Sequence, residues 1–254
     1  MPKIDDFSSK DEIVYDSLFL DSPFLPHAIV LTGGIASGKS TCIKILQEWG
    51  FSVVCADSIA HQVLEENADK LVEIFGEKIL LDFVFDTKSK NPQKSQPKIN
   101  RKELGKIIFA DDKKRKLLES ITHPQIHAKI YAKAQELEKT LSQKSQNNEQ
   151  KKYYFLDIPL FFEGGGKARY NARFSLSIIT TKALQLERIL RRDLLSLEQA
   201  QQRINSQIPS VEKMQKSDFV LFNNTTLEEL ESSLKDFIEM LDLCEKSKSK
   251  CDIR

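Results

Sequence analysis

Residues 32–41 read TGGIASGKST, a segment that contains the pattern GxxxxGK(S/T). An apolar run at 28–31 precedes it, and apolar residues at helical spacing follow it between 42 and 49. A loop of this kind binds nucleotide phosphates when a strand precedes it and a helix follows it, because backbone amides and the helix N-terminus then point at the anion. The context therefore predicts a nucleotide-binding loop. The competing interpretation is a turn rich in glycine and serine with a solvated lysine.

The residue types of this loop suggest a task for each part of it. The glycines permit positive φ and close approach of the backbone to phosphate. Lys39 is expected to reach the β and γ phosphates, Ser40 to bind magnesium through its hydroxyl, and Thr41 to cap the helix or contact the α phosphate. The ATP-binding residues predicted here are Gly33, Gly34, Ile35, Ala36, Ser37, Gly38, Lys39, Ser40 and Thr41.

Length and composition narrow the class of protein. A chain of 254 residues suffices for one α/β domain with insertions. A hydrophobic content of 40% and a charged content of 30% are ordinary for a globular protein and argue against disorder of the whole chain. The net charge of +1 predicts no dedicated nucleic-acid surface.

The compartment is predicted from the N-terminus and the cysteines. The first residues include several acidic ones and do not form a basic region that leads into an apolar one, as a secretion signal would. No apolar stretch is nearly long enough to cross a bilayer. The four cysteines lack CxxC spacing, so neither a zinc site nor a disulfide framework is expected. We therefore expect a cytoplasmic protein with no membrane partner, either a monomer or a weak homo-oligomer.

Short apolar segments alternate with helical or polar sequence along the chain. After the first strand from residue 28, further strands are expected at 52–56, 153–158, 174–179 and 219–222. This alternation predicts a parallel five-stranded sheet with helices on both faces. Helices are expected at 101–109, 113–121, from the first turn at Pro124, within 181–207 and at 226–243. The polar segment at 88–98 is expected to be a loop, and the helix after Pro124 is expected to fray into a polar surface linker at 139–152.

Two carboxylates follow predicted strands. Asp57 comes at the end of the second strand, where ligands bind in open α/β sheets, and can accept the proton of an attacking hydroxyl. The alternative is a helix N-cap. Asp157 ends the third strand, as does the carboxylate that holds magnesium or its water in nucleotide enzymes, but many buried strands also end in aspartate. Residues after Asp157 run into a glycine triplet beside this site, and Pro159, Leu160 and Glu163 are predicted substrate contacts.

Other candidates lie further along the chain. Arg188, Arg191 and Arg192 share one helix face and resemble a lid that neutralises charge on a transferring phosphoryl group, unless they form a solvated face paired with acidic neighbours. His123 is expected either to bind substrate or to cap a helix. Asn223 ends the last strand, where it either approaches the nucleotide or forms a turn.

These motifs together resemble the dephospho-CoA kinase family. The resemblance rests on TGGIASGKST at 32–41, CADSIAHQV at 55–63, THP at 122–124, DIPLFFE at 157–163, LERILRRD at 186–193 and DFVLFNN at 218–224. It implies transfer of the γ phosphoryl group of ATP, with Mg²⁺, to the ribose 3′-hydroxyl of dephospho-CoA, the last step of coenzyme A synthesis. ATP and dephospho-CoA are then the small-molecule partners.

The resemblance also implies an architecture and a set of roles. The fold would be a three-layer P-loop fold over 28–243, with a helical substrate region at 59–139, a lid at 181–207, an extension at 1–27 and a polar tail at 244–254. Asp57 would be the catalytic base, His123 would lie near the substrate, and Arg188 and Arg192 would lie near the phosphates. Lys39 and Asn223 would contact ATP, and Ser40 and Asp157 would bind the metal. Cys55 departs from the family pattern, because relatives often carry an acidic residue there.

Two other functions remain open. The glycine triplet at 164–166 is similar to one that binds a substrate carboxylate in shikimate kinases, although the segments at 55–63 and 122–124 argue against that family. The second is a GTPase-like switch or a nucleotide-binding module with no acceptor. The chain has no NKxD guanine-reading motif, which disfavours this alternative.

Overall fold

The computed structural model describes residues 22–81, 98–144, 151–193 and 195–246. Most of the extension at 1–27, most of the polar segment at 88–98 and most of the tail at 244–254 lie outside the described residues. The chain divides into two compact units, one formed by 1–55 and 134–254 and the other by 56–133.

The first unit contains a five-stranded sheet in the order β2-β3-β1-β4-β5, and every neighbouring pair is parallel. The prediction of a parallel five-stranded α/β fold is thus confirmed. The strands are β1 (Leu25–Gly33), β2 (Val53–Cys55), β3 (Tyr154–Asp157), β4 (Ala172–Ile179) and β5 (Phe219–Phe222).

The first strand begins earlier than the expected residue 28. Leu25 already pairs with β4, and its N–H donates to the carbonyl of Asn171 at 2.8 Å. The register then shifts before Ile29. Pro26 lies in this irregular stretch and has no N–H to donate to a sheet. For this reason the sequence did not indicate a strand before residue 28.

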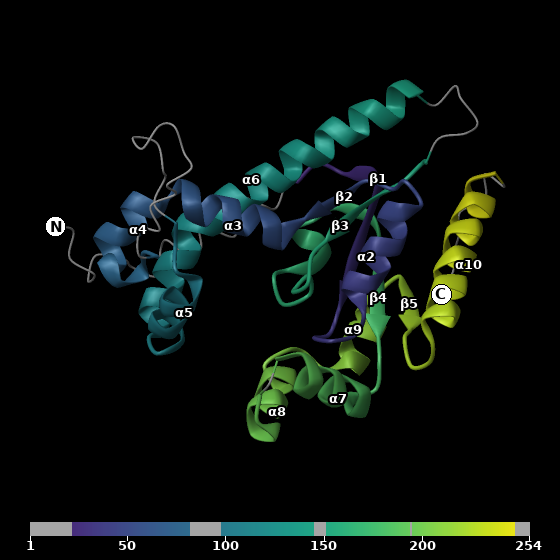
Figure 1. Cartoon of the computed structure of the whole chain (residues 1–254). Coiled ribbons are helices and arrows are strands. Elements are labelled where there is room, and N and C mark those ends of the chain that lie inside the picture. Colours follow the sequence, from purple (N-terminus) through teal and green to yellow (C-terminus); the bar gives the residue numbers. More distant parts are fainter. Residues whose placement is uncertain (1–21, 82–97, 145–150, 194, 247–254) are drawn as a thin grey trace, which may run out of the picture. The chain divides into compact units, whose positions relative to one another are not determined.

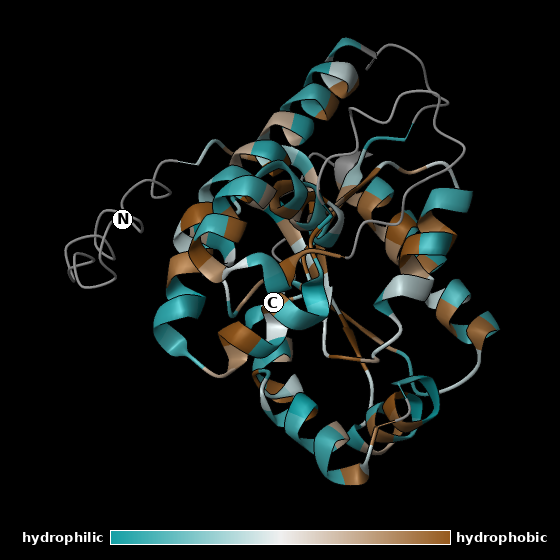
Figure 2. Cartoon of the chain, turned by 60° about the vertical axis from the view of Figure 1, so that its left-hand side comes forward, coloured by the Kyte–Doolittle hydropathy of each residue, from teal (hydrophilic) through white to brown (hydrophobic). Residues whose placement is uncertain are grey.

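Both faces of the central strand are covered. Ile29 and Leu31 are fully buried in a core that they share with α2 (Lys39–Glu48) and α10 (Leu227–Lys246). Ala28 and Val30, which point to the opposite face, are also fully buried. Figure 2 accordingly shows hydrophobic colour along the strands and helices with one hydrophobic and one hydrophilic side. Burial on both faces is what a parallel sheet between helix layers requires.

Three further helices of this unit lie between two strands. They are α7 (Lys182–Asp193), α8 (Leu197–Asn205) and α9 (Ser210–Lys216), and they connect β4 to β5 (Figure 1). Ser196 begins α8 with a capping box, since its hydroxyl accepts from Gln199 N and the Gln199 side chain accepts from Ser196 N. The predicted helical arm at 181–207 is therefore two helices joined by a short break.

The second unit is mostly helical. It contains α3 (Ala56–Glu66), α4 (Ala68–Phe75), a 3₁₀ turn (Glu77–Ile79), α5 (Arg101–Phe109) and the first part of α6 (Asp112–Lys144). Its core includes Leu71, Ile79 and Leu104, all nearly or fully buried. Reciprocal amide hydrogen bonds of 2.9 and 3.0 Å join Asn67 to Gln125.

The expected helix boundary at Pro124 was wrong, because α6 passes through this proline without a break. A proline inside a helix removes one backbone hydrogen bond and strains the preceding turn. Side chains support the helix on either side of it: Thr122 Oγ1 donates to the Leu118 carbonyl at 2.9 Å, and Gln125 Nε2 donates to the Ile121 carbonyl at 3.0 Å.

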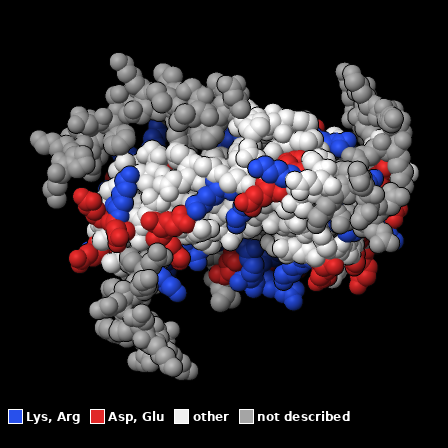
Figure 3. Space-filling model, turned by 90° about the horizontal axis from the view of Figure 1, so that it is seen from above, with Lys and Arg blue, Asp and Glu red and all other residues white. Residues whose placement is uncertain are grey.

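Surface charge, helix hydropathy and the state of the cysteines bear on the remaining expectations. Basic and acidic side chains are interspersed on the face drawn in Figure 3. Among the described residues, no helix combines the length and apolar character that a membrane span needs. Cys42 and Cys55 are not disulfide-bonded, whereas Cys244 in α10 is, a bond that the cysteine spacing did not indicate.

Candidate active site

The loop between β1 and α2 curls around the start of the helix. The N–H groups of Thr41 and Cys42 both donate to the Gly38 carbonyl, at 2.9 and 3.2 Å. Gly38 has a φ of 98°, and a Cβ there would collide with the side-chain amide of Asn223. Ala36 has a φ of 56°, the one positive value at a non-glycine residue in the described part of the chain. A tight loop ahead of a helix N-terminus is an anion-binding arrangement.

The two charged residues of the predicted phosphate site are paired. The Lys39 ammonium donates to Asp157 Oδ1, and the two side chains are only 13% and 6% exposed. The Cys55 thiol donates to Asp157 Oδ2 at 3.4 Å. Asp157 lies beside Leu31 and Cys55 in the sheet register, so the carboxyl ends of three strands meet here. This is the edge at which open α/β sheets bind ligands.

Other loop residues differ in exposure. Ser40 is exposed and Thr41 is half-buried, whereas Gly33 and Ser37 are buried. The Ser37 hydroxyl has no hydrogen-bond partner among the described residues. The ATP contacts predicted for this loop stay predictions.

Asn223 holds the loop from the end of β5. Its side-chain Nδ2 donates to the Ser37 carbonyl at 2.8 Å, and its backbone N–H donates to the Ile179 carbonyl at 2.7 Å. Its own carbonyl accepts from Thr180 Oγ1 at 2.8 Å. Asn223 is nearly buried, so in this structure its amide supports the loop, and the predicted nucleotide contact is untested.

Two glutamines that the sequence analysis did not single out contact the tip of the loop. Gln207 Oε1 accepts from the N–H of Ile35 at 2.8 Å, and Gln185 Nε2 donates to the carbonyl of Ile35 at 2.9 Å. Gln185 is nearly buried on the same face of α7 as Ile189. A polar residue at an apolar position of an amphipathic helix is the signal that would have found it.

The arginines of α7 separate into two environments. Arg188 donates to the carbonyls of Ala36 and Asn223 at 3.3 and 3.2 Å. Arg192 instead forms two hydrogen bonds with Asp193, at 2.6 and 2.9 Å. The hydrogen bonds from Arg192 hold the pKa of the Asp193 carboxyl below its ordinary value. Arg188 thus lies at the loop. Arg192 is instead paired with an acidic neighbour, as expected if it belonged to a solvated helix face.

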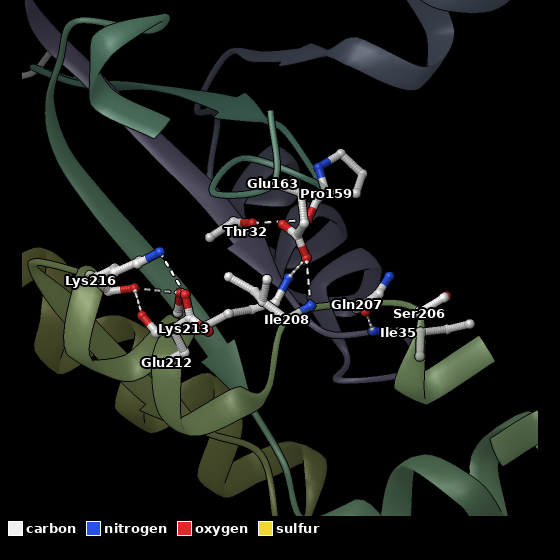
Figure 4. Close-up of polar contacts among 12 residues, drawn as sticks. Thr32, Ile35, Pro159, Glu163, Ser206, Gln207, Ile208, Glu212, Lys213 and Lys216 are labelled. Atoms are coloured by element: carbon white, nitrogen blue, oxygen red, sulfur yellow. Dashed lines mark hydrogen bonds and ion pairs between the residues drawn. The ribbon is translucent and has the colours of Figure 1, made fainter. Parts of the chain in front are cut away.

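The segment after β3 is tied to two elements. The Pro159 carbonyl accepts from Thr32 Oγ1 at 3.0 Å. Glu163 Oε1 accepts from Lys213 Nζ at 2.7 Å and from the N–H of Ile208 at 3.2 Å (Figure 4). Leu160 is 50% exposed. Lys213 is a third residue that the sequence did not single out, and the polar sequence around it does not indicate its burial.

Asp57 and His123 belong to the helical unit. Asp57 lies in the first turn of α3, two residues after β2 ends, and is exposed. His123 lies within α6, and its ring stands at 89° to the His127 ring with 6.5 Å between centroids. His123 is therefore inside a helix rather than at its cap. The roles predicted for both residues are untested.

Oxygen donors at the loop fit a magnesium ion. Mg²⁺ prefers oxygen ligands and takes only one or two from the protein when phosphate is bound. Ser40 offers a hydroxyl, and Asp157 offers carboxylate oxygens that in this structure accept from Lys39 and Cys55. No group of three or more histidine, cysteine, aspartate or glutamate side chains able to hold a metal occurs in the described residues.

Comparison with known proteins identifies the family. The model of the dephospho-CoA kinase family matches residues 27–229. The chain belongs to the dephospho-CoA kinase family. It is 42% identical over 217 residues to the dephospho-CoA kinase of Helicobacter hepaticus, covering 85% of this chain and 94% of that one. The dephospho-CoA kinase structure from Campylobacter jejuni has a TM-score of 0.61 and 38% identity, over 85% of this chain and 97% of that one.

Proposed function

We propose that this chain transfers the terminal phosphoryl group of ATP to the ribose 3′-hydroxyl of dephospho-CoA and so forms coenzyme A. The observation that carries the proposal is the loop before α2 with Lys39 and Asp157 at one sheet edge, in a chain of the dephospho-CoA kinase family. The dephospho-CoA kinases of Helicobacter hepaticus and Campylobacter jejuni are named for this activity.

ATP binding uses the loop and its lysine. Backbone amides of the loop and the N-terminus of α2 bind the phosphates, and Lys39 exchanges the Asp157 carboxylate for the β and γ phosphates. The exchange keeps the ammonium paired with a negative group, which matters because Lys39 is only 13% exposed. The triphosphate then lies with its terminal group free for attack.

Transfer needs a base and an acceptor oxygen. The 3′-oxygen forms a bond to the γ phosphorus while the bond from that phosphorus to the bridging β–γ oxygen breaks, and ADP leaves. The proton of the hydroxyl passes to the carboxylate of Asp57, the base in this proposal. His123, Pro159, Leu160 and Glu163 are the proposed contacts of the acceptor.

Charge on the phosphates is balanced by the lid and by a metal. Arg188, which already lies at the carbonyl of Ala36, is placed to neutralise the transferring group, and Arg192 does so only after leaving Asp193. Ser40 and Asp157 would hold Mg²⁺, which when bound neutralises charge on the β and γ phosphate oxygens. The proposal includes a cytoplasmic protein with no nucleic-acid or membrane partner, as a monomer or weak homo-oligomer.

A comparison of acceptors tests the proposal. ADP release is measured with ATP and Mg²⁺ in the presence of dephospho-CoA, shikimate or nucleoside monophosphates. We expect turnover with dephospho-CoA and with neither of the other acceptors. Turnover only with shikimate would show a different small-molecule kinase. ATP binding with no turnover on any acceptor would show a nucleotide-binding module instead.

A further inference from the structure

Both backbone hydrogen-bonding groups of Ile35 are held by side chains of the lid segment (181–207). The Ile35 N–H donates to Gln207 Oε1 at 2.8 Å, and the Ile35 carbonyl accepts from Gln185 Nε2 at 2.9 Å. Gln185 lies in α7, near the start of the lid segment, and Gln207 follows α8 at its end. Two side chains from opposite ends of this segment therefore meet at one residue of the nucleotide loop.

Glycine at position 34 makes this approach feasible. A Cβ at Gly34 would lie 2.5 Å from Gln185 Nε2 and 3.8 Å from Gln207 Oε1. A contact of 2.5 Å is closer than van der Waals packing permits. The absence of a side chain at Gly34 thus lets the glutamine amides reach the backbone of its neighbour.

A buried ion pair fixes the backbone that carries Gln207. The side chain of Lys213 is fully buried, and its ammonium donates to Glu163 Oε1 at 2.7 Å. The same carboxylate oxygen accepts from the N–H of Ile208, the residue after Gln207, at 3.2 Å (Figure 4). A buried ammonium needs its anionic partner, so Glu163 cannot leave Lys213 at low cost. Glu163 is thereby held where it anchors the Gln207–Ile208 segment.

Gln185 is held by its surroundings. It is only 4% exposed, and the next turn of α7 carries Arg188, which donates to the carbonyl of Ala36. A buried amide that loses its partner is costly, so the bond from Gln185 to Ile35 is favoured over an unpaired state. Consecutive carbonyls of the loop, those of Ile35 and Ala36, thus accept from one helix.

We infer that Gln185 and Gln207 are positioning residues that clamp the backbone at Ile35, so that the loop keeps its phosphate-binding shape and nucleotide affinity is coupled to the lid. The inference rests on the proposed function for its kinetic consequences and concerns the triphosphate, not the acceptor. The side-chain amides of Gln185 and Gln207 bind Ile35 rather than a ligand. The Ile35 N–H is directed to Gln207 instead of to phosphate.

Variants that keep the size of the side chain and remove its hydrogen bond test the clamp. Gln207→Met and Gln185→Met should each raise the KM for ATP about tenfold, since a lost hydrogen bond that leaves its partner unpaired is of that order, and leave the KM for dephospho-CoA unchanged. Gln201→Met is the matched control, because Gln201 is exposed on α8. Melting temperatures of all variants are measured in parallel.

A readout that needs no turnover separates this inference from the proposed function. Amide hydrogen exchange at Ile35, measured by NMR on the nucleotide-free full chain, should speed up in Gln207→Met and not in Gln201→Met. Gln207→Glu should restore the protection, because a carboxylate oxygen accepts the same N–H. Binding of ATP is followed calorimetrically in the same samples.

The outcomes are decisive. Unchanged amide exchange at Ile35 in Gln207→Met would overturn the clamp. Faster exchange with unchanged ATP affinity would also overturn it, because the contact would then be structural only. Should Gln207→Met not fold, the same two criteria apply to Gln185→Met, with ATP affinity and exchange across the loop as readouts. Altered exchange and ATP binding in a protein that does not phosphorylate dephospho-CoA would support the clamp and refute only the proposed acceptor.

Discussion

The ammonium group of Lys39, at the start of α2, donates a hydrogen bond to the carboxylate of Asp157, at the end of β3. Both side chains are largely withdrawn from solvent. A buried charge is tolerated when it is paired, so each residue supplies the opposite charge that the other needs. In the proposed function, a triphosphate that binds the loop competes with Asp157 for Lys39, which would link nucleotide binding to the stability of this pair.

Replacing Asp157 with asparagine should therefore destabilise the nucleotide-free protein. We expect a loss of about 3 kcal/mol in the free energy of unfolding, because the substitution leaves Lys39 without an anion. Saturating ATP should recover most of the loss, since phosphate then pairs with the ammonium. Urea unfolding with and without ATP measures both effects. Asp242→Asn, which removes an exposed ion pair with Lys152, should change stability by less than about 1 kcal/mol. Equal stability of Asp157→Asn and the unsubstituted protein would contradict the account.

Asp57→Asn tests the proposed base. The substitution keeps the shape of the side chain and removes its ability to take a proton, so kcat should fall by about 10² to 10⁴. The KM for ATP should change little, since Asp57 acts on the acceptor. Steady-state kinetics with both substrates measure these values. Asp69→Asn, at the matching position in the first turn of α4, is the control and should keep full activity. Undiminished kcat in Asp57→Asn would remove it from the mechanism.

Arg188 and Arg191 lie on the same helix but differ in what they contact. Arg188 donates to the carbonyls of Ala36 and Asn223, whereas Arg191 is exposed. Arg188→Met should lower kcat/KM for ATP by about 10³, the lower end of the effect of an arginine that stabilises a transferring phosphoryl group. Arg191→Met should stay within a few-fold of the unsubstituted enzyme. Equal effects of the two substitutions would show that position on the lid does not matter.

Cys42 should be chemically inert in the folded protein. Burial raises the pKa of its thiol to about 12, against an ordinary value of 9.0, so the thiol stays protonated near neutral pH. Peptide mapping after iodoacetamide treatment at pH 8 should show no modification of Cys42 until urea is added. Because the folded state disfavours the thiolate, stability should decline as pH rises through 9.0 towards 12. Rapid labelling of Cys42 in the native protein would contradict its burial.

Local sequence was enough to predict the sheet and the loop. Strands such as β5 are short apolar runs, and the glycines of residues 33–38 with Lys39 mark the loop, so both are encoded by neighbouring residues. The helix α6 continues through Pro124 because side chains and tertiary packing support it there. The helix propensity of proline taken by itself does not include these contacts. The prediction of a helix boundary there therefore failed.

The contacts that hold the site were harder to predict. Gln185 and Gln207 reach Ile35 across 150 and 172 residues, and Lys213 is buried by pairing with Glu163. A glutamine or lysine in a polar helix normally indicates a solvated side chain. For Gln207 and Lys213, only the three-dimensional arrangement shows that the side chains face inwards.

The most direct test of the account is the structure of the product formed from ATP and dephospho-CoA by the purified chain. Phosphorus and proton NMR of that product should show one new phosphomonoester on the 3′-oxygen of the ribose and one ADP released for each molecule formed. A phosphoryl group at any other position, or ADP released without a phosphorylated acceptor, would contradict the proposed reaction.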